Sequence, residues 1–456
     1  MTSLATITEF IDQLDLFDTH EHLAGFDWGF GTAKGGALGP THPHKTLPHA
    51  LMNDMLLYIT GAARYQGPSI APQSWKHEDA RDYWHAIQPA LEELRGASVY
   101  TVIRRGIQEL YGFDVDEVTD RNFDECNQRV LSVYQQKGQP AWMLEVLARA
   151  KVKGIIQMAH LPYLTEYWPS LPEERRKAEQ QVVRPSLVLE PFFFSGFEPD
   201  RSKARERTME LLQMHPANYE EHLAFQHEAV ARHKKAGGAA VKFICAYQRS
   251  LYFEKVPDSE ARRLYAKGWK NLNAEELTRL QDNLVWHLVR AAKEFGFTVQ
   301  LHTGYSNPAT RGHPENLQNL CRDKEFNEVN FYFCHAGWPH HGQLALMART
   351  YSNVHFGFCW MPGLSIGLAE RLMNEMFDML PANKMLNGMD CGHPESFYGT
   401  TVITKELVAK VLAAKVDSGW ISLRAAKTIA RRFLHDNAVN LFGRPEEKTQ
   451  LAATAA

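Results

Sequence analysis

Two histidines one residue apart, His20 and His22, are the first residues in the chain whose type and spacing could do chemistry. They follow a short apolar run, Leu14–Phe17, which we expect to lead a buried β-strand. Residues i and i+2 of a strand point to the same face, so both imidazoles can be directed at one point, with Asp18 on the same side one step deeper. Imidazole is a good ligand for zinc, iron and similar divalent metals. Histidine pairs also occur by chance, so the pair gains weight only if other parts of the chain supply further ligands.

Other apolar, strand-like runs carry residues that can bind a metal at or near their ends. These residues are His302, His335 and Asp390, and a further apolar run carries Lys242. In a barrel of parallel strands, the active site lies at the C-terminal ends of the strands, where these side chains would meet. Nitrogen and oxygen ligands without a thiolate are typical of a catalytic metal site that keeps one position open. The sequence therefore predicts a catalytic centre for a divalent metal.

The strands that must position these residues are predicted by eight apolar runs, most of them separated by helical stretches. The runs are Leu16–His22, Val152–Ala159, Val182–Phe194, Ala239–Ala246, Phe297–His302, Val329–His335, Val354–Cys359 and Lys384–Met389. Such alternation implies parallel strands with crossover helices. Eight units favour an α/β fold of the closed (β/α)8 type, a TIM barrel, over an open sheet.

The spacing of apolar residues changes between the first and second runs, where residues 46–149 are mostly helical in pattern. We expect a barrel formed by residues 1–45 plus 150–445 and a helical insertion, residues 46–149, that acts as a lid over the mouth. The final residues, 446–456, have the composition of a disordered tail.

Composition excludes several classes of function. The formal net charge is −3 and Lys and Arg form no cluster, which disfavours a nucleic-acid partner. No apolar run is long enough to span a membrane, and the N-terminus lacks the pattern of a signal peptide. The six cysteines form no CxxC pair, so we expect buried free thiols in a reducing compartment. These features predict a cytoplasmic protein that acts on a small molecule, with homo-oligomerisation left open.

The strand-end residues and their flanking motifs together resemble the amidohydrolase superfamily, and within it the amidohydrolase-2 branch. The segments VKFICAYQRSL, LHTGYSNP, CHAGWP and NGMDCGHPESFYG are similar to those of the FluG-type amidohydrolase domain. The resemblance covers about residues 14–30 and 150–443. The chain departs from the FluG-type pattern on the second strand, where Gln157-Met158-Ala159-His160 replace acidic residues. This departure leaves the identity of the substrate open and does not affect the expected metal site.

The resemblance implies a role for each candidate residue. His20 and His22 would bind the more buried metal with Asp390, which would also take a proton from the attacking water. His302 and His335 would bind a second metal, or one of them would contact substrate if a single metal is bound. In several branches the lysine that corresponds to Lys242 is carbamylated and bridges two metals. We therefore expect one or two divalent ions, with zinc first and iron or manganese as alternatives.

Further residues at strand ends are candidates for substrate binding: Arg249, Glu190, His160 and Trp338. Arg249 could hold a carboxylate through two hydrogen bonds, the alternative being a surface arginine. An unpaired buried ammonium is costly, so Lys242 needs a salt bridge, a carbamate or a substrate contact.

The leading function is hydrolysis of an amide, ester or lactone-like bond in a small organic molecule by a metal-activated water. The first alternative is non-oxidative decarboxylation or isomerisation of a small carboxylic acid at the same site. The second is a non-catalytic metal-binding or pathway-scaffold protein, which the intact set of ligands disfavours.

Overall fold

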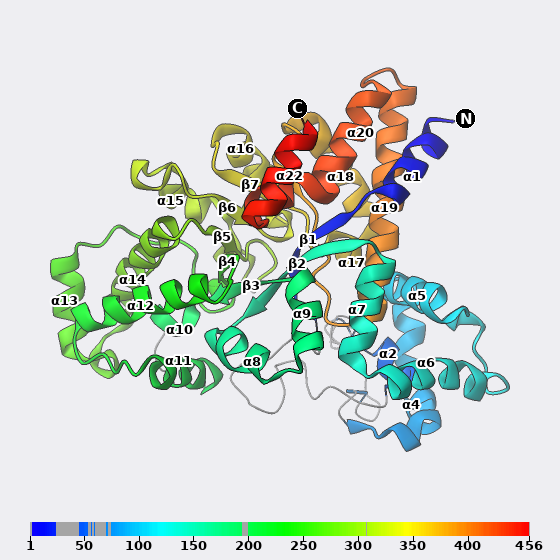
Figure 1. The fold of residues 1–456 in the computed structure, drawn as a ribbon, viewed down its shortest axis with the longest axis horizontal. Helices are drawn as coiled ribbons and strands as arrows, with labels where there is room; N and C mark the ends of the chain where they lie inside the picture. Colours follow the sequence, from blue (N-terminus) through cyan, green and yellow to red (C-terminus); the bar gives the residue numbers. More distant parts are fainter. Residues whose placement is uncertain are drawn as a thin grey trace.

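The computed structural model describes residues 2–23, 45–52, 56, 59, 70, 71, 74–193, 199–306 and 308–455. Eight parallel strands follow one another around a barrel in the order of the sequence (Figure 1). They are β1 (Leu16–Glu21), β2 (Val152–Ala159), β3 (Val183–Val188), β4 (Ala240–Phe243), β5 (Thr298–Leu301), β6 (Phe331–Phe333), β7 (Val354–Gly357) and β8 (Met385–Leu386). Backbone hydrogen bonds from Thr19 N to Asn387 O (3.2 Å) and from Asp390 N to His20 O (3.0 Å) join the last strand to the first. The predicted (β/α)8 barrel is confirmed, and each predicted run contains a strand.

The interior of the barrel is packed with side chains and is not a pore. Phe17, Ile156 and Leu386 belong to one buried cluster with Tyr332, whose hydroxyl lies 2.5 Å from Thr19 Oγ1. The N-terminal end is covered by α21 (Asn437–Phe442), which adds apolar side chains to this cluster. A second and larger core lies between the strands and the surrounding helices. The barrel therefore offers a rigid frame that is open for chemistry at its C-terminal end.

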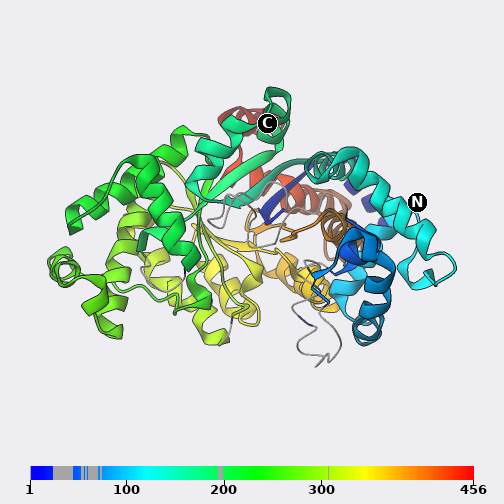
Figure 2. The same cartoon turned by 90° about the horizontal axis from the view of Figure 1, so that it is seen from below.

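Helices surround the barrel on its outer side (Figures 1 and 2). The helix before β1 is α1 (Ser3–Gln13), and the main helices between later strands are α9 (Glu173–Val182), α11 (Pro199–Leu212), α12 (Tyr219–Lys235), α13 (Asp258–Lys267), α14 (Ala274–Glu294), α16 (His341–Thr350) and α18 (Ile366–Met379). Shorter helices are α8 (Trp168–Ser170), α10 (Glu190–Phe193), α15 (Gln318–Arg322) and α17 (Met361–Leu364). After β8 the chain continues through α19 (Pro394–Asp417), α20 (Leu423–Arg431), α21 and α22 (Pro445–Ala455).

The prediction of a disordered tail is wrong, because most of it forms α22. Arg184, which is 2% exposed, forms an ion pair of 2.5 Å with Glu447 in this helix. A buried guanidinium needs an anionic partner, and the tail supplies it.

The segment between β1 and β2 contains helices, as its spacing predicts, in the parts that the structure describes. They are α2 (Leu47–Leu51), α4 (Ala80–Leu94), α5 (Ser98–Tyr111), α6 (Phe123–Lys137) and α7 (Gln139–Arg149), and Figure 2 shows them as a group beside the barrel. Helices α5 and α19 approach almost to backbone contact. A Cβ atom on Gly106 would lie 1.8 Å from the carbonyl oxygen of Glu395, and one on Gly399 would lie 1.7 Å from that of Val102. Glycine is therefore required at both positions for the insertion to seat on α19.

All six cysteines are buried free thiols, as expected. Among the described residues, no helix is both long and apolar enough to cross a membrane.

Candidate metal centre

Five of the predicted metal-binding side chains meet at the C-terminal mouth of the barrel: His20, His22, His302, His335 and Asp390. His20 lies on β1, and the other four follow β1, β5, β6 and β8 directly or within a few residues. Because the strands are parallel and consecutive, their ends bring together residues that are up to 370 positions apart in the chain.

Asp390 is the centre of this cluster. Its Oδ1 atom lies 3.5 Å from His20 Nε2 and 3.3 Å from His22 Nε2. Its Oδ2 atom lies 3.4 Å from His335 Nδ1, and His335 Nε2 lies 2.9 Å from His302 Nδ1. One carboxylate therefore contacts the histidine pair of β1 on one side and the histidine of β6 on the other.

Two acidic residues of β1 hold the loop that carries Asp390. Asp18 accepts hydrogen bonds from the backbone N–H groups of His20 (3.0 Å) and Met389 (3.2 Å), and Glu21 accepts one from Cys391 N (2.8 Å). Burial raises the pKa of both the Asp18 and Glu21 carboxyls. Asp18 thus anchors the loop after β8 rather than joining the metal-binding set.

The backbone is unusual where the ligands stand. Asp390 (φ 57°), His335 (φ 59°) and Ala336 (φ 51°) adopt left-handed conformations. Such conformations cost free energy for residues other than glycine and persist where the surrounding structure enforces them, often at functional sites. The register of β1 against β2 is also irregular between Asp18 and Glu21. Irregularities of this kind redirect side chains at strand ends.

The histidines of the cluster are electrically neutral. Burial, followed by the charge of Lys242, lowers the pKa of His22 and of His302 to about 3. The pKa of His20 is lowered well below its usual value by the same two causes, and that of His335 by burial and then by His302. A neutral imidazole keeps the lone pair that binds a metal.

Hydrogen bonds determine where the protons lie on two of the rings. His302 Nε2 lies 2.9 Å from the carbonyl oxygen of Tyr305, which can only accept, so Nε2 carries the hydrogen. Nδ1 of the neutral His302 ring must then accept, and His335 Nε2 donates to it. His335 Nδ1 is left with its lone pair 3.4 Å from the carboxylate of Asp390. Two electron-rich atoms facing each other are stabilised by a cation between them.

The donor set fits a divalent metal. The ligand atoms of His20, His22 and Asp390 lie within 4.8 Å of one another, and so do those of His20, Cys334 and His335. Metal–nitrogen distances of about 2.0–2.1 Å place tetrahedral ligands roughly 3.3–3.4 Å apart, close to the separations around Asp390. In addition, the buried Nδ1 atom of His20 has no hydrogen-bond partner among the described residues.

Cys334 is a candidate ligand that the sequence analysis leaves out. It precedes His335 and shares the inner face of β6 with Tyr332, two residues before it, which was the signal available in the sequence. Lys242, fully buried, donates from Nζ to Cys334 Sγ at 2.7 Å. Burial raises the pKa of the Cys334 thiol, but its contact with Cys359 and the charge of Lys242 outweigh this and bring the pKa to about 7. Lys242 therefore lies beside the cluster, next to a thiol.

Comparisons with known proteins identify the family of this chain. The family model for amidohydrolases, Amidohydro_2, matches residues 214–444, half of the chain. The chain belongs to the amidohydrolase family. It is also 24% identical to Protein fluG of Emericella nidulans in an alignment of 232 positions, which covers 47% of this chain and 26% of that protein.

Three solved structures share the barrel of this amidohydrolase over nearly the whole chain. Uronate isomerase from Thermotoga maritima has a TM-score of 0.77 at 15% identity and covers 96% of this chain and 97% of its own. Glucuronate isomerase from Caulobacter crescentus has a TM-score of 0.73 at 13% identity, with 98% and 95% covered. A candidate metal-dependent hydrolase from Lactobacillus casei has a TM-score of 0.63 at 16% identity, with 97% and 98% covered. At these identities the likeness is one of fold.

Three of the four predicted substrate-binding residues lie at the mouth of the amidohydrolase barrel. His160 follows β2 and Glu190 follows β3, and both are buried. The Glu190 carboxylate accepts a hydrogen bond from Ile244 N, which ties β3 to the loop after β4. Trp338 follows β6 and stacks with Tyr305, whose ring is 6.3 Å away.

The fourth residue, Arg249, contacts an outer helix of the barrel instead. Its guanidinium pairs with Asp282 and lies 2.9 Å from Gln281 Oε1, both on α14, and it covers the ring of Phe253. These contacts hold the loop after β4 against the outer helix. They do not support the expected role in binding a substrate carboxylate.

Tyr247 and Tyr305, which the sequence analysis did not single out, lie beside the histidines. The ring of Tyr247 lies 4.6 Å from that of His302, and Tyr305 meets Trp360 edge to face at 4.8 Å. Tyr305 lies within the LHTGYSNP motif, so its position was visible, but its orientation depends on the loop. These rings give the mouth of the barrel an apolar wall beside the polar cluster.

Proposed function

We propose that this amidohydrolase is a metal-dependent enzyme that hydrolyses an amide, ester or lactone-like bond in a small organic substrate. The observation that carries the proposal is the position of Asp390, whose two oxygens face neutral histidines from β1 and β6. A divalent cation bound there supplies Lewis acidity, which polarises a carbonyl and brings the pKa of water from about 15.7 to near 7.

The five side chains of the cluster would have different roles. His20, His22 and Asp390 would hold the cation, and the second oxygen of Asp390 is placed to accept a proton from an attacking water and to return it to the leaving group. His302 and His335 form a hydrogen-bonded pair whose proton positions are fixed by the Tyr305 carbonyl, so His335 Nδ1 points its lone pair at the same place. It can hold a second cation or bind the substrate.

The described helices of the insertion support a role in substrate selection. Among them, α5 packs against α17 and α19, and α7 packs against α19. Helices α17 and α19 begin just after β7 and β8, at the C-terminal end of the barrel. Loops and additions at this end shape the substrate site in barrels of this kind. We infer that the insertion, through its described helices, forms one wall or lid of the site.

Isomerisation is the second candidate, because two sugar-acid isomerases match over nearly the entire chain, the insertion included. At such a site Asp390 or a histidine would move a proton between neighbouring carbons, and no water would be consumed. Decarboxylation loses its main support, since Arg249 is engaged by Asp282.

The experiment is a substrate panel on protein reconstituted with zinc, manganese or iron. Amides, esters and lactones are followed by acid release, uronates by formation of the keto product, and carboxylic acids by CO₂ release. We expect hydrolysis that requires added metal and falls at least 100-fold in Asp390→Asn. The matched control is His287→Gln on the outer helix α14, which should leave the rate unchanged. Turnover of uronates alone would favour the isomerase, and equal activity of Asp390→Asn would refute both.

A further inference from the structure

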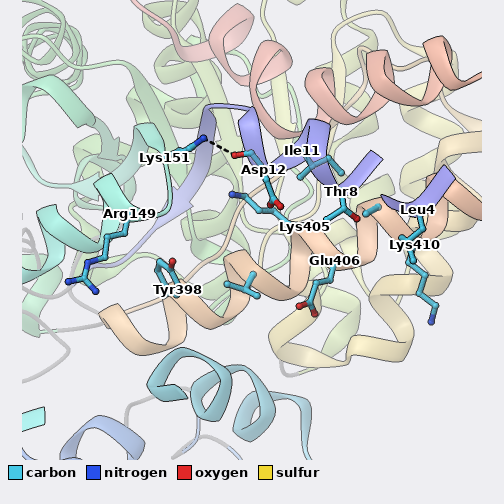
Figure 3. Close-up of a pocket in the computed structure, with 12 residues that line it drawn as sticks. Leu4, Thr8, Ile11, Asp12, Arg149, Lys151, Tyr398, Lys405, Glu406 and Lys410 are labelled. Carbon is cyan, nitrogen blue, oxygen red and sulfur yellow. Dashed lines mark hydrogen bonds between the residues drawn. The ribbon is translucent and has the colours of Figure 1, made fainter. Parts of the chain in front are cut away.

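A pocket lies at the opposite end of the barrel from the histidine cluster. It has a volume of about 570 Å³ and lies between α1, α19 and the junction of α7 with β2 (Figure 3). Its residues Asp12, Arg149 and Lys151 all precede strands, which places them at the N-terminal end of the barrel. The metal-binding candidates follow strands, so the two sites do not overlap.

Three of the charged side chains around this pocket form ion pairs with residues outside its lining. Arg149 pairs with Glu145 at 2.6 Å, Lys410 with Glu370 at 2.7 Å, and Glu406 with Arg105 at 2.9 Å. These three side chains have partners that neutralise them outside the pocket.

Two lysines are different. Lys151 is exposed and donates from Nζ to the backbone carbonyl of Asp12 at 2.8 Å, and it forms no ion pair with a residue that the structure describes. Lys405 makes no hydrogen bond or ion pair with any residue that the structure describes, although it is only partly exposed. Burial is the main cause of a lowered pKa of Lys405. The Asp12 carboxylate raises this pKa in part, and the charge of Lys151 lowers it further. The pocket therefore holds two ammonium groups that share one nearby carboxylate.

The uncharged lining is mostly apolar or aromatic, with one hydroxyl from Thr8. Figure 3 shows Tyr398 and Arg149 at one end of the pocket, with Lys405 between them and Ile11 and Thr8 of α1. A ligand with an anionic group and a compact apolar or aromatic part matches such a lining. An inorganic anion would contact only the charged side chains of the pocket and leave the apolar lining uncovered.

We propose that this pocket binds a small organic anion, whose carboxylate or phosphate lies between the ammonium groups of Lys151 and Lys405. Charge-assisted hydrogen bonds from the two lysines provide the affinity for the anionic group. The Tyr398 ring and the apolar side chains of α1 and α19 cover the rest of the ligand. The site is independent of the metal centre and of the reaction performed there.

Calorimetric titration of the full-length, metal-free protein with phenyl phosphate and benzoate tests the proposal and distinguishes phosphate from carboxylate. We expect saturable binding of one equivalent of at least one probe, weakened tenfold or more in Lys405→Met. Lys410→Met, on the same helix but paired with Glu370, is the matched control and should change affinity less than twofold. Asp12→Asn removes the opposing charge at an exposed position and should tighten binding about threefold.

The same titration with Asp390→Asn separates this pocket from the metal centre. Binding that is unchanged in Asp390→Asn and lost in Lys405→Met supports the proposal. Binding lost in Asp390→Asn would place the anion at the metal centre and overturn it. Equal affinity in the wild type, Lys405→Met and Asp12→Asn, or no binding of either probe, would also overturn it.

Discussion

Replacing Glu395 should test how firmly the insertion is joined to the loop that carries Asp390. Glu395 lies in the first turn of α19 and is fully buried. It accepts hydrogen bonds from Lys45 Nζ (2.9 Å), Tyr111 Oη (2.8 Å) and Tyr134 Oη (2.7 Å), all from the part of the chain between β1 and β2. One carboxylate is therefore the shared acceptor of three donors from the other side of the interface.

The magnitude follows from what the substitution leaves behind. Glu395→Ala leaves the Lys45 ammonium, which is 4% exposed, without its counter-charge. Breaking one partner of a buried ion pair costs about 3–5 kcal/mol. Two buried tyrosine hydroxyls also lose their acceptor, so we expect the upper part of that range. Lys45→Met should cost less, because Glu395 keeps both tyrosine donors.

The assay is urea unfolding of the wild type, Lys45→Met, Glu395→Ala and Lys45→Met/Glu395→Ala, combined with hydrogen exchange of peptides from α5 and α19. The double variant should lose roughly 1–3 kcal/mol less unfolding free energy than the sum of the two single losses. Exchange should rise in α5 and α19 and stay unchanged in the distant α14. A cost below about 1 kcal/mol for Glu395→Ala, or additive single effects, would show that this network does not hold the insertion in place.

Three further predictions concern other parts of the molecule. Arg249→Ala should cost about 3–5 kcal/mol of unfolding free energy, because Asp282 stays buried without its partner. The same variant should change KM less than twofold. A tenfold rise in KM with unchanged stability would instead support a role of Arg249 in substrate binding. Burial lowers the pKa of His222 and His233 to about 4, so the unfolded chain binds their protons first as the pH falls through 6.5, and each should remove about 1 kcal/mol of stability between pH 6.5 and 5.5; urea unfolding that is flat over this range would contradict it. If a carbamate on Lys242 bridges two ions, Lys242→Ala should lower the bound metal from two equivalents to one or fewer, and a single equivalent in both proteins would refute the bridge.

Much of the fold was predictable because a parallel strand buried on both faces must be apolar, whatever its neighbours. The run Val152–Ala159 coincides with β2 for this reason. Strand ends were less predictable. The run Val329–His335 predicts a strand as far as its histidine, yet β6 ends at Phe333, because His335 and Ala336 turn into left-handed conformations that bring the imidazole to Asp390.

The site was predictable in its ligand types but not in the contacts that support it. The spacing of His20 and His22, and the position of Asp390 after an apolar run, depend only on local pattern. The partner of Arg249 could not be read from the sequence, because Asp282 is a helix residue that resembles any solvated acid until the helix is placed. The order of α22 depends in the same way on Arg184, which lies on a strand far away in the chain.

The central claim is that His20, His22 and Asp390 bind one divalent metal. A crystal structure of the zinc-reconstituted protein, with data collected at the zinc absorption edge, tests it most directly. The account predicts an anomalous peak about 2.0–2.2 Å from His20 Nε2, His22 Nε2 and a carboxylate oxygen of Asp390. Zinc bound only elsewhere, or these three side chains left without a peak at full metal occupancy, would contradict it.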